Sequence, residues 1–335
     1  MAAKQKIARI VGVGSYVPEQ VLTNADLEKM VDTSGEWIVQ RTGIEERRIA
    51  GGAEASSDMG IAAAIKALEV SGKSASEIDL IIVATMTPDV ISSATASLIQ
   101  EKLKASRAGA VDIQAACTGF IYGLSMAKAF IESGMYQNVL LVASEKMSSV
   151  TDYTDRSTCI LFGDGASAVV ISDEGKGLAV GNVSLGSDGS CADLITIPAG
   201  GSRDPITKEN IDKGMHFVKL EGREVFKHAV RRMAGVCSEC LRLSNIELED
   251  VAWLVAHQAN MRIIDALARK LDFPEEKIIK TVSKYGNTSA SSVPLALDEL
   301  LENKEVNPGQ TILLTAFGAG LSWGAATLKV MNEEN

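Results

Sequence analysis

The fold is indicated first by the stretch DLIIVAT at residues 79–85, which returns in similar form as DVAWLVAH at residues 250–257. In both places an aspartate precedes an apolar run, and a polar residue follows it. Apolar runs of this length favour strands that are buried on both faces of a sheet. Thr85 ends the first stretch and His257 ends the second, at an offset of 172 residues. We therefore expect the same kind of buried strand twice, each time with a polar side chain at its carboxyl end.

Other segments repeat in the same order. Cys117 corresponds to Asn287 at an offset of 170 residues, and the run at 138–141 corresponds to the run at 310–313 at an offset of 172. The expected strands are 80–84, 139–143, 251–256 and 311–315, and the expected helices between them include 118–133 and 291–302. Alternation of strands and helices is typical of an α/β fold, and the nearly constant offset indicates a duplicated α/β unit.

The duplication divides the chain into two expected domains, an N-terminal half at 1–175 and a C-terminal half at 176–335. The halves meet near residues 172–180, where Ser-Asp-Glu-Gly-Lys-Gly is typical of a turn. In the second half, residues 186–215 are rich in Gly, Ser and Asp and have no counterpart in the first half. Long loops of this kind tend to be functional, so we expect a lid-like insertion here.

Composition places this chain of 335 residues among ordinary globular proteins, with 46% hydrophobic and 23% charged residues. No apolar run reaches the roughly 18 residues of a membrane span, and no signal-type stretch follows the start of the sequence. We therefore expect a soluble, cytoplasmic protein. The formal charge of -10 excludes a general attraction to nucleic acid or to anionic membranes, so an acidic partner would have to bind at a local basic patch.

The cysteines predict no disulfide framework. Their number is odd, they are scattered, and the chain carries no secretion signal. They are Cys117, Cys159, Cys191, Cys237 and Cys240. Cys237 and Cys240 form a C-x-x-C motif without a second pair, inside a stretch with a helical pattern. Packing in a helix interior is therefore favoured over zinc binding, and no metal site is expected.

Cys117 has the most suggestive surroundings of the five. The segment before it alternates like a strand, and the segment after it has helical spacing up to Gly134, a typical C-terminal cap. The sulfur is therefore expected at a strand-to-helix turn. A helix N-terminus can lower the thiol pKa from its usual value of about 8.5. The alternative is a small buried hydrophobic residue.

His257 and Asn287 become candidates through their positions in the repeat. His257 directly follows a buried strand, and ligands bind at the carboxyl ends of strands in open α/β sheets. Catalysis and helix capping both remain open for this histidine, although Asn260 is the better cap. The segment YGNTSAS at 285–291 would by itself be a turn before a helix. Because Asn287 takes the place that Cys117 has in the first half, we expect all three side chains to face one central cleft.

Three other functions fit parts of the pattern. Cys, His and Asn in this order also occur in papain-like hydrolases, where the Asn orients the His. Gly12-x-Gly14 suggests a dinucleotide-binding loop, but Val17 stands where the third glycine of that fingerprint belongs. A non-catalytic scaffold is also possible, although it would not need the three candidate side chains.

Four motifs carry a resemblance to a known family. They are CTGF at 117–120, HQAN at 257–260, GNTS at 286–289 and FGAGLSWG at 317–324. Their order and spacing resemble those of the β-ketoacyl-acyl-carrier-protein synthase III family of the thiolase superfamily. Segments nearer the N-terminus agree: GVGSYVP at 12–18, TN at 23–24, WI at 37–38, RTGI at 41–44 and RR at 47–48. The resemblance covers about residues 7–330 and implies a duplicated, thiolase-like α-β-α-β-α layered fold with two mixed sheets.

The resemblance also implies a mechanism. Cys117 would take an acyl primer from acyl-coenzyme A, with the tetrahedral oxyanion held by the backbone N–H groups of Cys117 and Ala319. His257 and Asn287 would stabilise the enolate formed when malonyl-acyl-carrier protein loses CO2, giving 3-oxoacyl-acyl-carrier protein in the initiating step of fatty acid synthesis. No cofactor is implied. The family commonly has Gly-Gly-Gly where this chain has Gly318-Ala319-Gly320, and alanine resists a positive φ.

Further residues match binding positions of the family. Trp37 and Arg156 match a pair that sandwiches the adenine of coenzyme A, Arg41 matches a phosphate contact, and Asn260 matches a residue near the pantetheine arm. Docking of the carrier protein is expected on two basic helix faces, of which the first has Arg223, Lys227 and Arg231 and the second has Arg262, Arg269 and Lys270. Of these residues, Lys227 and Arg262 also match docking positions of the family. The family also implies a homodimer, with residues 90–93 reaching the primer pocket of the partner. Another thiolase-type condensing enzyme, making a ketide or a hydroxymethylglutaryl-type thioester, is the alternative, and primer preference stays open.

Overall fold

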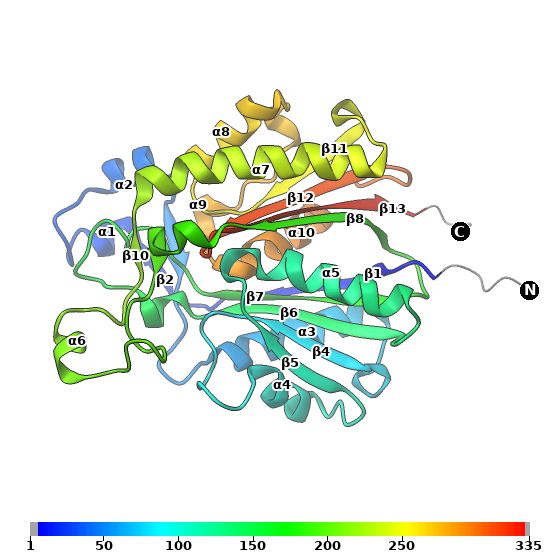
Figure 1. Cartoon of the computed structure of the whole chain (residues 1–335), viewed down its shortest axis with the longest axis horizontal. Helices are drawn as coiled ribbons and strands as arrows, with labels where there is room; N and C mark the ends of the chain where they lie inside the picture. Colours follow the sequence, from blue (N-terminus) through cyan, green and yellow to red (C-terminus); the bar gives the residue numbers. More distant parts are fainter. Residues whose placement is uncertain (1–5, 332–335) are drawn as a thin grey trace, which may run out of the picture.

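The computed structural model describes residues 6–331 and is built around a nine-stranded mixed sheet (Figure 1). The expected buried strands are present. The strands of the first half are β1 (Arg9–Tyr16), β4 (Leu80–Ala84), β5 (Gly109–Ile113), β6 (Asn138–Glu145) and β7 (Gly165–Ser172). Those of the second half are β8 (Leu178–Ser187), β11 (Val251–Ala256), β12 (Thr311–Gly318) and β13 (Ser322–Val330). β4, β6 and β12 are buried along their whole length, as their continuous apolar runs predict.

The two sets of strands have the same order. The first runs β1-β7-β6-β4-β5 and the second runs β8-β13-β12-β11. An isolated parallel bridge between Leu254 and Ile278 extends the second set where β5 extends the first. The two expected sheets join at one corner, where β1 pairs with β8 through Arg9–Ala179 and Ile10–Leu178. Residue 175, at the predicted boundary between the halves, lies in the turn between β7 and β8.

Helices cover the strands in an α-β-α-β-α arrangement (Figure 1). α3 (Ser56–Ser71) and α4 (Thr95–Leu103) pack on the outer face of the first set, and α7 (Gly222–Ser244) packs on the outer face of the second with α8 (Met261–Leu271) against it. α5 (Gly119–Glu132) and α10 (Ser292–Asn303) lie between the two sets and are buried among strands of both. This layering confirms the predicted thiolase-like fold class.

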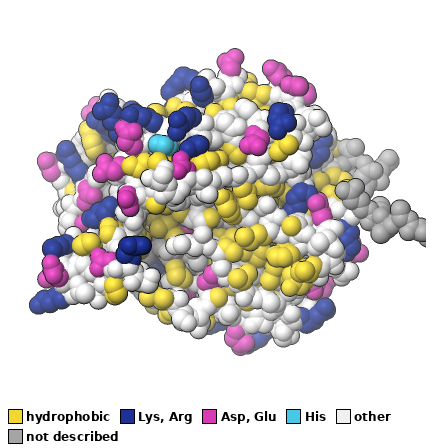
Figure 2. Space-filling model, viewed as in Figure 1, with side chains coloured by type: hydrophobic (Ala, Val, Ile, Leu, Met, Phe, Trp, Pro, Cys, Tyr) yellow, Lys and Arg dark blue, Asp and Glu magenta, His cyan; other side chains and the backbone are white. Residues whose placement is uncertain are grey.

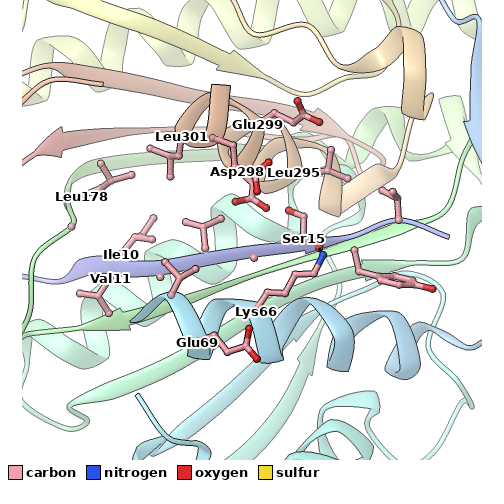
Figure 3. A pocket seen from close by; sticks show the side chains of 18 of the residues that line it. Ile10, Val11, Ser15, Lys66, Glu69, Leu178, Leu295, Asp298, Glu299 and Leu301 are labelled. Atoms are coloured by element: carbon pink, nitrogen blue, oxygen red, sulfur yellow. Dashed lines mark hydrogen bonds between the residues drawn. The ribbon is translucent and has the colours of Figure 1, made fainter. Parts of the chain in front are cut away.

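Gly12 and Gly14 serve packing, because β1 runs directly against α3. A Cβ on Gly12 would lie 2.2 Å from the carbonyl oxygen of Ala67, and a Cβ on Gly14 would lie 2.5 Å from its nitrogen. These glycines lie inside a strand and form no phosphate-binding loop before a helix, which argues against the dinucleotide site. A cavity of about 860 Å³ opens beside this part of β1, between α3 and α10, and none of the predicted site residues lines it (Figure 3).

Smaller elements complete the chain around the site. They are β2 (Val21–Thr23), α1 (Asn24–Leu27), α2 (Gly35–Thr42), β3 (Glu46–Arg48), β9 (Ile195–Thr196), α6 (Lys208–Asp212), β10 (Lys219–Leu220) and α9 (Val282–Tyr285). The five cysteines are free thiols, and Cys237 and Cys240 are buried in α7, as expected. Between residues 6 and 331, the helices are too short or too polar to span a bilayer.

Candidate active site

One cavity of about 730 Å³ brings together residues from both halves of the chain. Cys117 from the first half and His257 and Asn287 from the second all line it. Six residues predicted for coenzyme A or carrier-protein binding also line it: Trp37, Arg41, Arg223, Lys227, Asn260 and Arg262. Five other predicted residues lie outside its lining: Arg156, Arg231, Arg269, Lys270 and Ala319. The three candidate catalytic groups thus share one space, although they are far apart in the sequence.

Cys117 lies at the predicted strand-to-helix turn. The 3-10 turn Ala116–Thr118 connects β5 to α5, and Ala116 has a φ of 45°, which strains a residue with a side chain. Thr118 holds the turn, since its Oγ1 donates to the Ala115 carbonyl at 2.6 Å and shares a hydrogen bond with Ser322 Oγ at 2.7 Å. The sulfur is therefore fixed at the beginning of α5.

Burial has the largest influence on the pKa of the Cys117 thiol. Loss of hydration raises this pKa to about 12, against the lowering effect of a hydrogen bond with Ser289. The nearby Glu145 carboxylate raises the pKa further. A thiolate here would lose its hydration, which is the largest of these influences. The resting thiol keeps its proton and must release it during a reaction.

His257 is a buried, neutral imidazole at the end of β11. It is 3% exposed, and burial lowers its pKa to about 4. Its Nδ1 lies 2.6 Å from Ser292 Oγ, and this oxygen accepts the Gln258 N–H at 3.4 Å. The Ser292 hydroxyl can donate its proton to Nδ1, and in this arrangement the ring N–H of His257 stands on Nε2. His257 is then a neutral hydrogen-bond donor.

Asn287 is held so that its amide nitrogen remains free to donate. Its backbone N–H donates to Leu161 at 2.8 Å, and its carbonyl accepts from Gly163 at 3.1 Å. Its Oδ1 accepts the backbone N–H of Ser289 at 2.9 Å, which leaves the NH2 group for the cavity. The contact on Nδ1 of His257 is Ser292 and not Asn287, so the site differs from papain-like sites, where Asn orients His.

The Gly318-Ala319-Gly320 segment accommodates its alanine. A Cβ on Gly318 would lie 2.8 Å from the Cys117 nitrogen, so the close approach of this segment to the nucleophile requires glycine there. Gly320 has a φ of 132°, whereas Ala319 is not among the non-glycine residues with positive φ. Ala319 therefore does not adopt the positive φ that a residue with a side chain disfavours.

Trp37 on α2 is flanked by two arginines. The guanidinium carbons of Arg41 and Arg156 lie 5.7 and 5.3 Å from the centre of its ring. Arg156 also donates to the carbonyl of Asp32 at 3.0 Å. A flat ring stacked between two partners needs roughly 7 Å, twice an optimal contact distance. Arg156 must therefore move outward before a ring can enter between it and Trp37.

Asn260 is the N-cap of α8, as expected. Its Oδ1 accepts the Ile263 N–H at 3.0 Å, so its amide nitrogen remains available on the cavity side. The residue thus combines a capping contact with a place in the cavity wall.

The predicted basic residues fall into two groups. Lys227 on α7 and Arg262 on α8 line the cavity, and the Arg262 guanidinium lies 5.8 Å from the Phe226 ring centre. Arg269 and Lys270 lie in the last turn of α8, outside it. Figure 2 shows Lys and Arg side chains gathered over the N-terminal end of α7, with some Asp and Glu among them. A local basic surface therefore exists despite the net charge of -10.

Glu145 was not among the predicted residues, although it lies beside the nucleophile. It ends β6 and is fully buried. The position of Glu145 could have identified it from the sequence. β6 and β4 pair in parallel, so the carboxyl ends of both strands lie at the same edge of the sheet. A charged residue that closes a buried apolar strand at such an edge is a candidate site residue.

Comparisons with known proteins show similarity over nearly the whole chain. The models of 3-oxoacyl-[acyl-carrier-protein (ACP)] synthase III and of its C-terminal part match residues 111–189 and 241–330. A β-ketoacyl-[acyl-carrier-protein] synthase III of Chlamydia pneumoniae is 54% identical over 97% of this chain and 98% of the relative.

Solved structures of related enzymes have the same fold as this chain. The crystal structure of 3-oxoacyl-[acyl-carrier-protein] synthase III from Aquifex aeolicus has a TM-score of 0.88 and 46% identity, covering 96% of this chain and 99% of that chain. A priming β-ketosynthase from the R1128 polyketide pathway has a TM-score of 0.90 and 36% identity, covering 99% of this chain and 98% of that chain. Because identity and coverage are both high, the chain belongs to the β-ketoacyl-acyl-carrier-protein synthase III family of condensing acyltransferases.

Proposed function

We propose that this enzyme initiates fatty acid synthesis by joining an acyl primer from acyl-coenzyme A to malonyl-acyl-carrier protein, with Cys117, His257 and Asn287 as its catalytic residues. The observation that carries the assignment of residues is that a thiol, a neutral imidazole and a free carboxamide line one cavity from two halves of the chain. In this proposal the halves 1–175 and 176–335 are repeats that contribute the nucleophile and the two donors, respectively.

The first step is acyl transfer. The Cys117 sulfur attacks the thioester carbonyl, and the oxyanion that forms accepts hydrogen bonds from the backbone N–H groups of Cys117 and Ala319. The approach of Gly318 to the Cys117 nitrogen supports this assignment, because it places the 318–320 segment beside the nucleophile. Coenzyme A thiol leaves, and the acyl group stays on Cys117.

The second step needs charge stabilisation. Loss of CO2 from the malonyl group leaves a thioester enolate, whose oxygen accepts hydrogen bonds from Nε2–H of His257 and from the Asn287 amide. Neutral donors suit this step, and the lowered pKa of His257 keeps its ring neutral at pH 7. The enolate carbon then attacks the acyl carbon on Cys117, the bond from that carbon to Sγ breaks, and Cys117 leaves as a thiolate that takes up a proton to restore the thiol. Decarboxylation supplies the carbanion and the thioester supplies the electrophile, so the proposed reaction requires no metal or redox cofactor.

Coenzyme A is proposed to bind at the Trp37 side of the cavity. The adenine would stack between Trp37 and Arg156 after Arg156 moves outward, and Arg41 would meet a phosphate group. The free amide nitrogen of Asn260 would face the pantetheine arm. The cluster of Trp37 and two guanidinium groups supports this placement, because it combines an aromatic face with positive charge.

The acidic carrier protein is proposed to dock on the basic face formed by Lys227, Arg262, Arg269 and Lys270. Arg262→Glu is expected to lower kcat/KM for malonyl-acyl-carrier protein about tenfold at low salt, since charge complementarity governs encounter. The difference should shrink as ionic strength rises. Steady-state rates over a salt series measure both effects.

Lys304→Glu is the matched control for this prediction. It makes the same change of charge at an exposed position, just after the C-terminal end of α10 and outside the cavity lining. It is expected to leave the rate unchanged. An equal loss in both variants, or a loss in Arg262→Glu that is independent of salt, would contradict docking at this face.

A homodimer is proposed through the edge strand β5. β5 ends the sheet, Val111 on it is 43% exposed, and the nearby Ile91 is 95% exposed. Unpaired strand edges and exposed apolar side chains favour association with a second copy. This arrangement would also bring residues 90–93 toward the primer pocket of the partner.

Sedimentation is expected to give twice the chain mass of 35.4 kDa. Val111→Asp should shift the protein to monomer, because it places a charge on the pairing edge. Val70→Asp introduces the same charge at a 68% exposed position of α3 and should leave the dimer intact. A monomeric wild-type protein would refute the proposed assembly.

The proposed activity is tested directly by rate measurements with malonyl-acyl-carrier protein and a panel of acyl-coenzyme A primers. Formation of 3-oxoacyl-acyl-carrier protein with release of CO2 is expected. The relative rates with straight and branched primers measure the primer preference. Acylation of Cys117 without any condensation product would refute the proposal. Cell fractionation tests the expected cytoplasmic location.

A further inference from the structure

The proposed oxyanion site depends on contact between the two halves of the chain. Its two backbone donors are the N–H groups of Cys117, from the first half, and Ala319, from the second. An oxyanion is stabilised when both donors lie within hydrogen-bond distance of one point. The separation of the two halves must therefore be fixed at this place.

Gly318 limits how closely the two donors can approach. A Cβ on this residue would lie 2.8 Å from the Cys117 nitrogen and 3.2 Å from the Cys117 Cβ, so Gly318 already packs against the nucleophile. Repulsion between packed atoms prevents a closer approach, but it does not prevent the 318–320 segment from moving away. A directional attraction between the two halves is needed to hold the segment in place.

A pair of buried hydroxyl groups supplies this attraction. Thr118 Oγ1, in the turn of the nucleophile, lies 2.7 Å from Oγ of Ser322, the first residue of β13. Oγ of Ser322 also lies 2.9 Å from the carbonyl oxygen of Ala319 and 3.3 Å from that of Ala115. Thr118 is 0% and Ser322 is 6% exposed, and both lie outside the lining of the cavity. The pair therefore joins the two donor segments without reaching the substrate.

The two hydroxyl protons are sufficient for this bridge. If Thr118 donates to Ser322, the Ser322 proton goes to the Ala319 carbonyl. The Ala115 carbonyl then keeps the backbone N–H of Thr118 at 3.1 Å. If Ser322 donates to Thr118, the Thr118 proton goes to the Ala115 carbonyl at 2.6 Å. In both arrangements one proton lies between the two hydroxyl oxygens, so the halves stay joined.

Other contacts of the 318–320 segment lie within the second half. Leu321 exchanges two backbone hydrogen bonds with Asp188, at 2.8 and 3.0 Å. Gly318 pairs with Ser322 across the hairpin of β12 and β13. These contacts hold the shape of the segment, whereas the bond between the hydroxyls acts on its distance from Cys117.

We propose that Thr118 and Ser322 are positioning residues, whose hydroxyl pair holds the N–H groups of Cys117 and Ala319 at the separation that the tetrahedral intermediate requires. This inference rests on the proposed function, which assigns the oxyanion to these two N–H groups. The pair acts whenever a tetrahedral intermediate forms on Cys117, in acyl transfer and again in condensation. It takes no part in decarboxylation, because the enolate is assigned to two other side chains.

Thr118→Val is the first test, because it removes one hydroxyl and keeps the branched shape of the side chain. Acylation of Cys117 by p-nitrophenyl acetate and by acetyl-coenzyme A is expected to slow about tenfold, since a displaced donor stabilises the oxyanion less well. Alkylation of Cys117 by iodoacetamide forms no oxyanion and should keep the wild-type rate. Decarboxylation of malonyl-acyl-carrier protein should also be unchanged. Peptide mass spectrometry of quenched samples gives the rates of acylation and alkylation.

Ser322→Ala removes the other hydroxyl and should give the same pattern of rates. Because the two residues share one hydrogen bond, the double variant Thr118→Val/Ser322→Ala should lose about as much acylation as the more affected single variant. Thr118→Ser and Ser322→Thr each keep a hydroxyl group, so both should acylate at nearly the wild-type rate.

Thr327→Val is the matched control. Thr327 also lies on β13, is 2% exposed, and its hydroxyl pairs with the Ser244 hydroxyl at 3.2 Å. Its loss removes a buried pair of the same kind outside the cavity lining, and all the rates should stay at the wild-type level.

Wild-type acylation in both Thr118→Val and Ser322→Ala would overturn the proposal. Equal losses of acylation and alkylation would also overturn it, because they would show that the nucleophile itself has moved. Additive losses in the double variant would contradict a shared bond. p-Nitrophenyl acetate needs neither coenzyme A nor a carrier protein. A wild type that this ester acylates, but that forms no 3-oxoacyl product, would therefore refute the proposed function alone.

Discussion

Cys117→Ser is expected to abolish acyl transfer from acyl-coenzyme A. The change replaces sulfur by oxygen in a side chain held by its own turn, so the fold and the cavity should remain. A serine hydroxyl is a much weaker nucleophile than a thiol, and His257 is a weak base for it because burial lowers the pKa of this histidine to about 4. Intact-mass spectrometry after mixing with acetyl-coenzyme A should show one acetyl group on the wild type and none on the variant.

Cys191→Ser is the control, since Cys191 is also partly exposed but lies outside the cavity lining. It should be acylated at the wild-type rate. Decarboxylation of malonyl-acyl-carrier protein should persist in Cys117→Ser, because His257 and Asn287 are intact. A stable acyl group on another residue of Cys117→Ser, located by peptide mapping, would refute the assignment of the nucleophile.

The parts of the fold that depend on local pattern were predictable from the sequence. The runs at 80–84 and 251–256 are strands with these same limits, because apolar runs bounded by polar residues leave little freedom in placing their ends. The join of β1 to β8 was not predictable. It involves two residue pairs only, and such a short ladder depends on how the two sets of strands meet in space.

The convergence of the three candidate residues on one cavity was predictable from the repeat. Cys117, His257 and Asn287 lie at strand ends or turns that correspond between the halves, so their convergence follows from the duplication. The rise in the pKa of Cys117 was not predictable, because it depends on how much water the cavity wall excludes. Glu145 was missed because a single carboxylate at the end of β6 resembles an ordinary strand end in the sequence, whereas its full burial and its hydroxyl and backbone N–H partners depend on the fold.

Asn287→Ala is expected to separate the two steps of the reaction. Acylation of Cys117 should continue near the wild-type rate, because the proposed oxyanion donors of that step are backbone N–H groups. Condensation should fall by about 10²- to 10³-fold, the usual cost of removing one donor to a developing oxyanion. Single-turnover measurements on enzyme that already carries an acetyl group isolate the second step.

Asn287→Asp tests the effect of charge at this position, and Asn303→Ala is the control. The aspartate keeps an acceptor for the Ser289 N–H but places a negative charge where the enolate forms, so its loss should be at least as large as that of the alanine variant. Asn303→Ala removes an exposed amide at the end of α10 that bonds Glu299, and it should have no effect. Loss of acylation in Asn287→Ala would assign this residue to the first step or to packing. Unaltered product formation would leave His257 as the proposed side-chain donor to the enolate.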